Sequence, residues 1–152
     1  MSAASTTGRD LVTRKSVLSK ELLKLPPLQS ILVVDDNDQD AMHIAALMHL
    51  LLGRKIQVHR FKLVATAIFG IKKQMPDLVV VDDFIPPVDR AESSINSFRR
   101  FGYDGPIIVV SGMLTKQRRR EISRLQPLAM LHKDEIDSFS VAEVLLRLVE
   151  SD

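Results

Sequence analysis

Three short apolar runs, each directly followed by or ending in a polar residue, constrain the fold of this chain more than any other feature. They are "ILVV" at 31–34, "LVVV" at 78–81 and "PIIVVS" at 106–111. Apolar runs of this length are typical of strands that are covered on both faces. The segments between them have helical periodicity, so we expect strands and helices to alternate.

The same signals predict the remaining elements. We expect further strands at 55–61 and 128–132, and helices at about 38–52, 63–74, 91–101, 115–125 and 139–150. Asn37 or Asp38 can cap the first of these helices, and Gly53 can end it. Crossovers from strand to helix to strand require a parallel sheet with helices on both faces. The sequence therefore predicts an α/β fold with a doubly wound, five-stranded parallel sheet and five helices.

The residues before the first strand are predicted to form an N-terminal extension over 1–29, followed by one domain over 30–152. Residues 1–10 are small and polar, and Pro26 and Pro27 end the segment that follows them. One helical face of that segment carries four leucines: Leu11, Leu18, Leu22 and Leu25. Two interpretations stay open, namely a helix that docks on the domain or on a second copy, and a disordered basic tail.

Composition excludes several classes of protein. Residues 1–24 carry five basic and two acidic groups, which leaves 16 basic and 17 acidic groups for the rest of the chain, so we expect no nucleic-acid partner. No apolar run approaches the ~20 residues that span a bilayer, so we expect no membrane insertion. The absence of cysteine excludes disulfides and thiolate sites, and it is compatible with a cytoplasmic location.

Polar side chains stand at the carboxyl ends of four predicted strands. Ligands of doubly wound sheets bind at this edge. We therefore expect one site there, built from side chains that are far apart in the sequence: Asp35, Asp36, Asp82, Ser111 and Lys133.

These residues, in this order, resemble the receiver domain of two-component response regulators. "PDLVVVDDFIP" at 76–86 is similar to the family pattern Pro-Asp-Leu, three apolar residues, Asp, three residues and Pro. "GPIIVVSG" at 105–112 matches the fourth strand with its terminal hydroxyl. The resemblance covers roughly residues 30–150. It implies a flavodoxin-like sheet of order 2-1-3-4-5. We expect no output domain after it, as in a stand-alone receiver.

The resemblance also implies roles for the clustered residues. Asp82 is the expected phosphoacceptor, with the Ser111 hydroxyl and the Lys133 ammonium as ligands of the phosphoryl oxygens. The expected ligands of one Mg²⁺ are Asp35, Asp36, Asp82 and the backbone carbonyl of Phe84. Three like charges repel one another, and a small hard cation would resolve that conflict. Taken alone, Asp35 and Asp36 could merely cap the following helix.

The choice between Asp82 and Asp83 as phosphoacceptor depends on spacing. The distances in sequence from Pro76 and to Pro86 favour Asp82. Strand alternation sends the side chain of Asp83 the other way, and we expect it to be a solvated loop residue. The run "KQRRR" at 116–120 is expected to be a solvated helix face or a docking surface for an acidic partner.

The leading hypothesis for function is a phosphorylation-dependent switch or relay protein, not an enzyme acting on other substrates. Its expected partners are a histidine kinase or a histidine phosphotransfer protein and an unknown target, with the chain a monomer or homodimer. A pseudo-receiver that binds a partner constitutively is the alternative. A Mg²⁺-dependent aspartyl-phosphate phosphohydrolase is less suited, because it would need a second aspartate where Phe84 stands.

The sequence departs from the family pattern in three places. Asp134 follows Lys133 where receivers usually have a cis proline, so we expect a trans bond and a changed loop. Met130 replaces a common switch aromatic, and Gln126-Pro127 replaces Gly-Ala. These departures put the usual switch in doubt. The four histidines lack metal-ligand spacing, and we expect them on the surface: His43, His49, His59 and His132.

Overall fold

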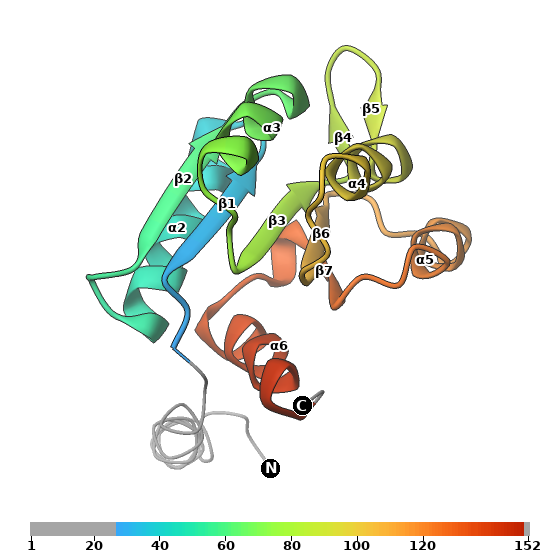
Figure 1. The fold of residues 1–152 in the computed structure, drawn as a ribbon. Coiled ribbons are helices and arrows are strands. Elements are labelled where there is room, and N and C mark those ends of the chain that lie inside the picture. The colour runs from blue at the N-terminus through green and yellow to red at the C-terminus, as the bar shows by residue number, and fades with distance from the viewer. Residues whose placement is uncertain (1–26, 151–152) are drawn as a thin grey trace, which may run out of the picture.

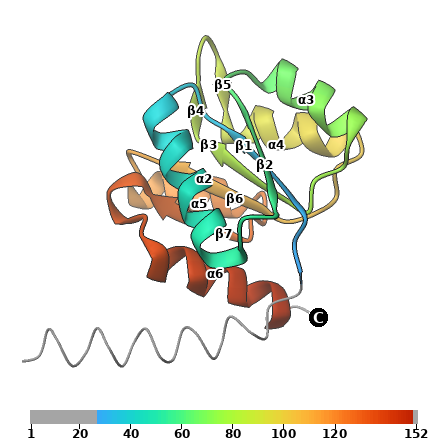
Figure 2. The same ribbon diagram turned by 90° about the vertical axis from the view of Figure 1, so that its left-hand side faces the viewer.

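A computed structural model of the chain describes residues 27–150 and has a central sheet between two layers of helices (Figures 1 and 2). The predicted docking helix or tail lies outside these residues. The sheet strands are β1 (Ser30–Val34), β2 (Gln57–Phe61), β3 (Leu78–Asp82), β6 (Ile107–Ser111) and β7 (Ala129–His132). All adjacent pairs are parallel, in the order β2-β1-β3-β6-β7. This confirms the predicted order 2-1-3-4-5 for the five main strands.

The helices confirm the predicted alternation. They are α2 (Asp38–Leu52), α3 (Val64–Lys73), α4 (Ala91–Arg100), α5 (Lys116–Ser123) and α6 (Ser138–Glu150). The Asn37 side chain caps α2 by accepting the N–H of Asp40, so Asp35 and Asp36 are not its caps. Gly53 ends α2 with a φ of 102°, a conformation that glycine adopts without strain.

The central strands alternate between two cores, which explains their continuous apolar runs. Ile31 and Val33 of β1 pack in a core with α2 and α6, whereas Leu32 and Val34 pack in a core with α3, α4 and α5. The strands β3 and β6 alternate in the same way. Burial of both faces favours Val, Ile and Leu at every position, so the strands contain no alternation of polar residues.

Three small elements were not predicted. The strands β4 (Phe84–Ile85) and β5 (Asp89–Arg90) form an antiparallel hairpin directly after β3, and η1 (Lys133–Glu135) is a short 3-10 helix after β7. A cis peptide bond joins Pro86 and Pro87 within the hairpin. In the described part of the chain no helix has the length and apolar character needed to cross a bilayer.

Candidate functional site

The carboxyl ends of four sheet strands bring the predicted site residues together. Asp35 follows β1, Asp82 and Ser111 end β3 and β6, and Lys133 follows β7. Because all these strands run in parallel, their ends meet at one rim of the sheet. The rim holds a cavity of about 610 Å³ whose lining includes Asp36, Asp82, Phe84, Ser111 and Lys133.

Lys133 is shared by three carboxylates. Its Nζ lies 2.8 Å from Asp40 Oδ2, 3.0 Å from Asp82 Oδ2 and 3.1 Å from Asp35 Oδ2. Burial alone would lower the pKa of Lys133, but its interactions with these carboxylates, the hydrogen bond to Asp40 first and that to Asp82 next, outweigh burial and raise the pKa. Lys133 is therefore a fixed cation at the rim.

Sequence reasoning missed Asp40 as part of this cluster. It lies in the first turn of α2 and also lines the cavity. The available signal was its place one turn after Asp36, on a helix that starts at the same rim. Pattern matching against strand ends does not include helix residues, so this contact with Lys133 was not expected.

The surroundings of Asp82 disfavour its ionised form. Burial and then the neighbouring Asp35 carboxylate raise the pKa of Asp82 to about 6, although Lys133 acts in the opposite direction. The backbone N–H of Phe84 also donates to Asp82 Oδ1, at 3.5 Å. Lys133 and the N–H of Phe84 thus do not offset the effects of burial and of Asp35 on the ionised form of Asp82.

The donor set fits a small hard cation such as Mg²⁺. Carboxylate oxygens of Asp35, Asp36 and Asp82 lie within 4.8 Å of one another. Asp35 Oδ1 accepts the N–H of Asn37, whereas the buried Oδ2 accepts no hydrogen bond, although the Lys133 ammonium lies 3.1 Å away. An orphaned carboxylate oxygen in an acidic cluster is what a metal ion would satisfy. The Phe84 carbonyl as a further ligand stays a prediction.

Ser111 lies at the end of β6 with its hydroxyl directed to the next turn. Ser111 Oγ accepts the N–H of Met113 at 3.1 Å, which leaves the hydroxyl proton available for donation. Both residues line the same cavity as Asp82. The geometry therefore provides a hydroxyl donor and a lysine ammonium around one carboxylate.

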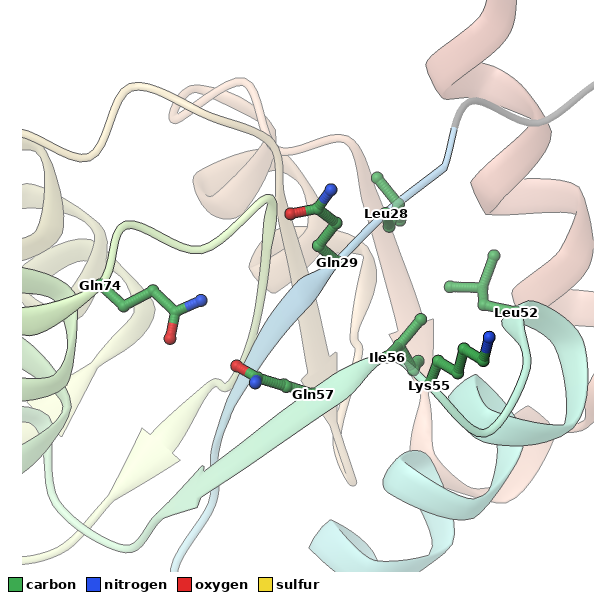
Figure 3. A pocket seen from close by; sticks show the side chains of 7 residues that line it. All are labelled: Leu28, Gln29, Leu52, Lys55, Ile56, Gln57 and Gln74. Carbon is green, nitrogen blue, oxygen red and sulfur yellow. The ribbon is translucent and has the colours of Figure 1, made fainter.

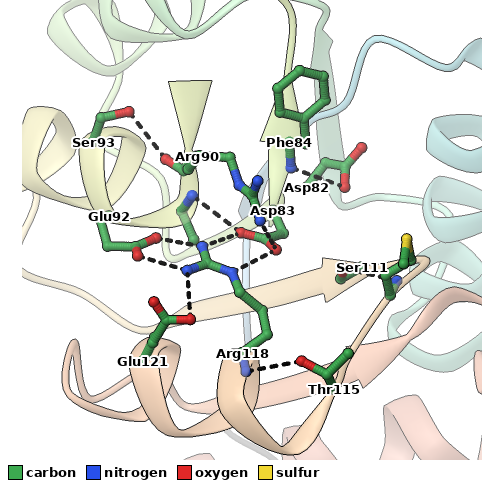
Figure 4. A network of polar contacts seen from close by, with 12 residues as sticks. Asp82, Asp83, Phe84, Arg90, Glu92, Ser93, Ser111, Thr115, Arg118 and Glu121 are labelled. Atoms are coloured by element: carbon green, nitrogen blue, oxygen red, sulfur yellow. Dashed lines mark hydrogen bonds and ion pairs between the residues drawn. The ribbon is translucent and has the colours of Figure 1, made fainter. Parts of the chain in front are cut away.

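The structure contradicts the expected exposure of Asp83 and of the whole "KQRRR" run. Asp83 is buried and binds Arg118 of α5, which donates from Nε at 2.9 Å and from Nη2 at 2.5 Å (Figure 4). The same guanidinium binds both carboxylate oxygens of Glu92 on α4. Arg118 is thus a buried ion-pair partner, whereas Lys116, Gln117, Arg119 and Arg120 are exposed as expected.

This network explains why Asp83 tolerates burial. Burial alone would raise the pKa of Asp83, but hydrogen bonds from Arg118 and from the N–H of Ala91 lower it below the ordinary value. The alternation of side chains along β3 sends Asp82 toward α2 and Asp83 toward α4 and α5, as predicted. The partner itself lies 35 residues away, and its identity could not be read from a local pattern.

The loop after β7 contains Asp134, one of the departures from the family pattern. Among residues 27–150 the only cis bond is Pro86–Pro87, so the predicted trans bond after Lys133 is confirmed. A turn of 3-10 helix, Lys133–Glu135, forms this loop, and the His132 side chain caps it by accepting the N–H of Asp134. Met130 packs against the core beside α5.

A second cavity, of about 350 Å³, lies at the opposite end of the sheet (Figure 3). Its lining combines glutamines, aliphatic side chains and one lysine: Leu28, Gln29, Leu52, Lys55, Ile56, Gln57 and Gln74. These residues offer no carboxylate or hydroxyl group. The rim at the carboxyl ends of the strands is therefore the better candidate site.

Comparison with known proteins supports the fold. No family model matches the sequence, and no curated protein sequence matches it. The signal receiver domain of the putative response regulator NarL from Mycobacterium tuberculosis has a TM-score of 0.68 at 15% identity, covering 84% of this chain and 100% of that chain. The BeF3-activated N-terminal receiver domain of Klebsiella pneumoniae RstA has a TM-score of 0.67 at 20% identity, covering 82% and 100%.

A response regulator receiver domain protein from Clostridium thermocellum is similar to the same extent. Its TM-score is 0.68 at 13% identity, over 82% of this chain and 96% of that chain. These likenesses confirm the predicted receiver-domain fold. The roles of individual side chains have to be argued from the site itself.

Proposed function

We propose, with the receiver-domain fold as premise, that this chain is a phosphorylation-dependent signalling switch or relay protein whose phosphoacceptor is Asp82. The observation that carries the proposal is the contact of Lys133 with Asp82 in a cavity that Asp36 and Ser111 also line. Four separate elements supply these groups, and each is the residue type that phosphoryl transfer to a carboxylate needs.

In the proposed reaction a carboxylate oxygen of Asp82 attacks the phosphorus of a phosphohistidine. The new P–O bond forms an acyl phosphate, the P–N bond breaks, and the imidazole nitrogen keeps the bonding electron pair. Lys133 and the Ser111 hydroxyl bind the phosphoryl oxygens, and the N–H of Phe84 orients the carboxylate. When bound to Asp35, Asp36 and Asp82, Mg²⁺ would neutralise negative charge at the site.

Loss of the phosphoryl group is a second displacement at phosphorus, in which the Asp82 carboxylate is the leaving group. A water oxygen attacks the phosphorus, the P–O bond to Asp82 breaks, and inorganic phosphate and the free carboxylate are formed. In this proposal the protein catalyses only its own phosphorylation and dephosphorylation. Its partners would be a histidine kinase or histidine phosphotransfer protein and a downstream protein, in the cytoplasm.

A constitutive binding module is the second candidate, and one observation favours it. Arg118 ties α5 to Asp83 through a buried ion pair and to Glu92 on α4 through a partly buried one, and neither involves Asp82. Such a network would hold α5 in place whether or not Asp82 is modified. The two candidates differ in whether Asp82 accepts a phosphoryl group at all.

Intact-protein mass spectrometry after incubation with a small phosphodonor tests the proposal. We expect one phosphoryl group per chain when Mg²⁺ is present and none when it is chelated. Asp82→Asn should abolish the mass increase, and the exposed-site control Asp38→Asn should retain it. An unlabelled wild-type protein would favour the constitutive module, and labelling of Asp82→Asn would assign another acceptor.

A further inference from the structure

Arg90 lies at the rim of the Asp82 cavity although no sequence pattern pointed to it. The hairpin after β3 places Arg90 opposite Phe84, and both residues line the cavity with Asp82 and Lys133. Its side chain is 51% exposed. Among the described residues that line this cavity, four are acidic and only Arg90 and Lys133 are basic.

The present partner of Arg90 holds it weakly. Arg90 Nη2 lies 3.4 Å from Asp83 Oδ2, whereas Arg118 donates to both oxygens of the same carboxylate at shorter distances. Asp83 would keep Arg118 and the N–H of Ala91 if Arg90 moved away. Release of Arg90 therefore leaves no buried charge unpaired, and a half-exposed ion pair of this length costs little to break.

Arg90 is held on the rim of the Asp82 cavity by more than this ion pair. Its guanidinium carbon lies 5.8 Å from the centroid of the Phe84 ring, within cation–π range. Figure 4 shows the guanidinium beside the Asp83 carboxylate and next to Phe84, whose backbone N–H faces Asp82. If the Arg90 side chain rotated on this rim, its guanidinium would leave the Asp83 carboxylate and bind a group attached to Asp82 instead.

The charge balance at Asp82 gives that exchange a reason. Lys133 is already divided among three carboxylates. A phosphoryl group would add further negative charge and three strong acceptor oxygens to Asp82. The planar fork of an arginine matches phosphoryl oxygens better than a second carboxylate does, because it can donate two parallel hydrogen bonds.

We propose that Arg90 is a phosphoryl-binding residue, which leaves Asp83 and binds the oxygens of the phosphoryl group on Asp82 from the side opposite Lys133. This inference rests on the proposed function of Asp82. It assigns the β4–β5 hairpin a role as the carrier of a second cationic ligand, in addition to the lysine after β7.

Binding of beryllofluoride, a mimic of the phosphoryl group, tests this assignment on the full chain in the presence of Mg²⁺. Calorimetry or fluorine NMR gives the affinity for wild type, Arg90→Ala, Arg90→Lys and the matched surface control Arg100→Ala. Loss of a charge-assisted hydrogen bond predicts roughly ten- to a hundredfold weaker binding for Arg90→Ala. Arg90→Lys should recover part of it, and Arg100→Ala should match wild type.

Mg²⁺ affinity without beryllofluoride separates phosphoryl binding from a structural role. Removing a positive charge from the rim should leave the Mg²⁺ affinity of Arg90→Ala unchanged or make it tighter. Wild-type affinity of Arg90→Ala for beryllofluoride, or a parallel loss of Mg²⁺ binding, would overturn the assignment. If wild type itself fails to bind beryllofluoride, or Asp82→Asn binds it equally well, the proposed function fails and takes this inference with it.

Discussion

Asp82 and Asp83 are neighbours in the chain and are almost equally buried, yet their carboxylates have opposite electrostatic surroundings. Their exposed fractions are 6% and 3%. The pKa of Asp82 is raised to about 6, by burial first and then by Asp35, whereas the pKa of Asp83 is lowered because Arg118 outweighs the same effect of burial. Burial therefore does not distinguish the two residues, and the charge of their partners does.

The two sides of the strand end differ in charge balance. Around Asp82, the carboxylates of Asp35 and Asp40 share the ammonium of Lys133 with Asp82 itself, and an Asp36 carboxylate oxygen lies within 4.8 Å of those of Asp35 and Asp82. Around Asp83, the guanidinium groups of Arg90 and Arg118 meet the carboxylates of Asp83 and Glu92, and the Glu121 carboxylate lies further out, 3.9 Å from Arg118 (Figure 4). The balanced cluster is complete as it stands. The cluster around Asp82 has an excess of negative charge, and it is suited to bind a cation that the protein does not supply.

Arg118→Met should disrupt the ion pairs around Asp83 and have the largest effect on stability. The substitution leaves the buried Asp83 with only the distant Arg90 and one backbone N–H, so we expect a loss of about 3–5 kcal/mol in the free energy of unfolding. Urea denaturation followed by circular dichroism measures it. Arg119→Met, on the exposed face of the same helix, should change stability by no more than about 0.5 kcal/mol. Equal losses for both variants would contradict a structural role of the Arg118 ion pairs.

Mg²⁺ should bind the acidic cluster around Asp82 and stabilise the folded chain. At ~100 times its dissociation constant the ion should raise the free energy of unfolding by about 2.7 kcal/mol, because it binds the folded chain. Asp36→Asn should remove most of this gain. Asp38→Asn should retain it, because Asp38 pairs with Lys62 and lies outside the cluster. Denaturation curves with Mg²⁺ and with a chelator decide the matter, and a gain that survives in Asp36→Asn would argue against this site.

Phe84→Asn should change the rate at which the phosphoryl group is lost from Asp82, and it has the smallest expected effect of the three substitutions. The Phe84 ring is 47% exposed on the rim, and a phenyl group cannot position a water molecule by hydrogen bonding. We expect phosphorylated wild type to lose its label roughly tenfold more slowly than Phe84→Asn, within the ~10²-fold that orientation can contribute.

The measurement is decay of the label after removal of the donor, at one Mg²⁺ concentration for both proteins. If the ring faces a partner instead, the rates will be equal and the hypothesis fails. Faster decay with Phe84 in place would contradict it as well.

The fold could be predicted because each central strand is buried on both faces. That burial leaves continuous apolar runs at 31–34, 78–81 and 107–110, and parallel pairing then places their ends at one rim. The positions of Asp35, Asp82, Ser111 and Lys133 followed from the strand ends alone. Their proximity is confirmed, and their roles stay predictions.

The remaining features depend on contacts between distant segments. Nothing near Asp83 in the sequence indicates Arg118, which belongs to a helix whose other basic residues are exposed. The hairpin that brings Arg90 to the rim has strands of two residues, too short to show a period. Asp40 belongs to a helix that was interpreted only for its apolar face. The contacts of these three charged residues could not be predicted from the sequence.

The sign of the stability change in two matched substitutions tests the contrast between the Asp82 and Asp83 carboxylates most directly. The folded-state pKa of Asp82 lies above its ordinary 3.8, so its contribution to stability is fully present below about pH 3.8 and is lost as the pH rises through about 6. Near pH 7.5, without Mg²⁺, the ionised Asp82 therefore opposes folding. Asp83 behaves in the opposite way, because its pKa is lowered and its contribution is lost only as the pH falls.

The measurement is the free energy of unfolding of Asp82→Asn and Asp83→Asn near pH 7.5 with a chelator present. The account predicts opposite signs: a gain of up to about 3 kcal/mol for Asp82→Asn, and a loss for Asp83→Asn, which leaves Arg118 with one partner fewer. The gain should disappear near pH 4. A loss of stability in both variants, or a gain in both, would contradict it.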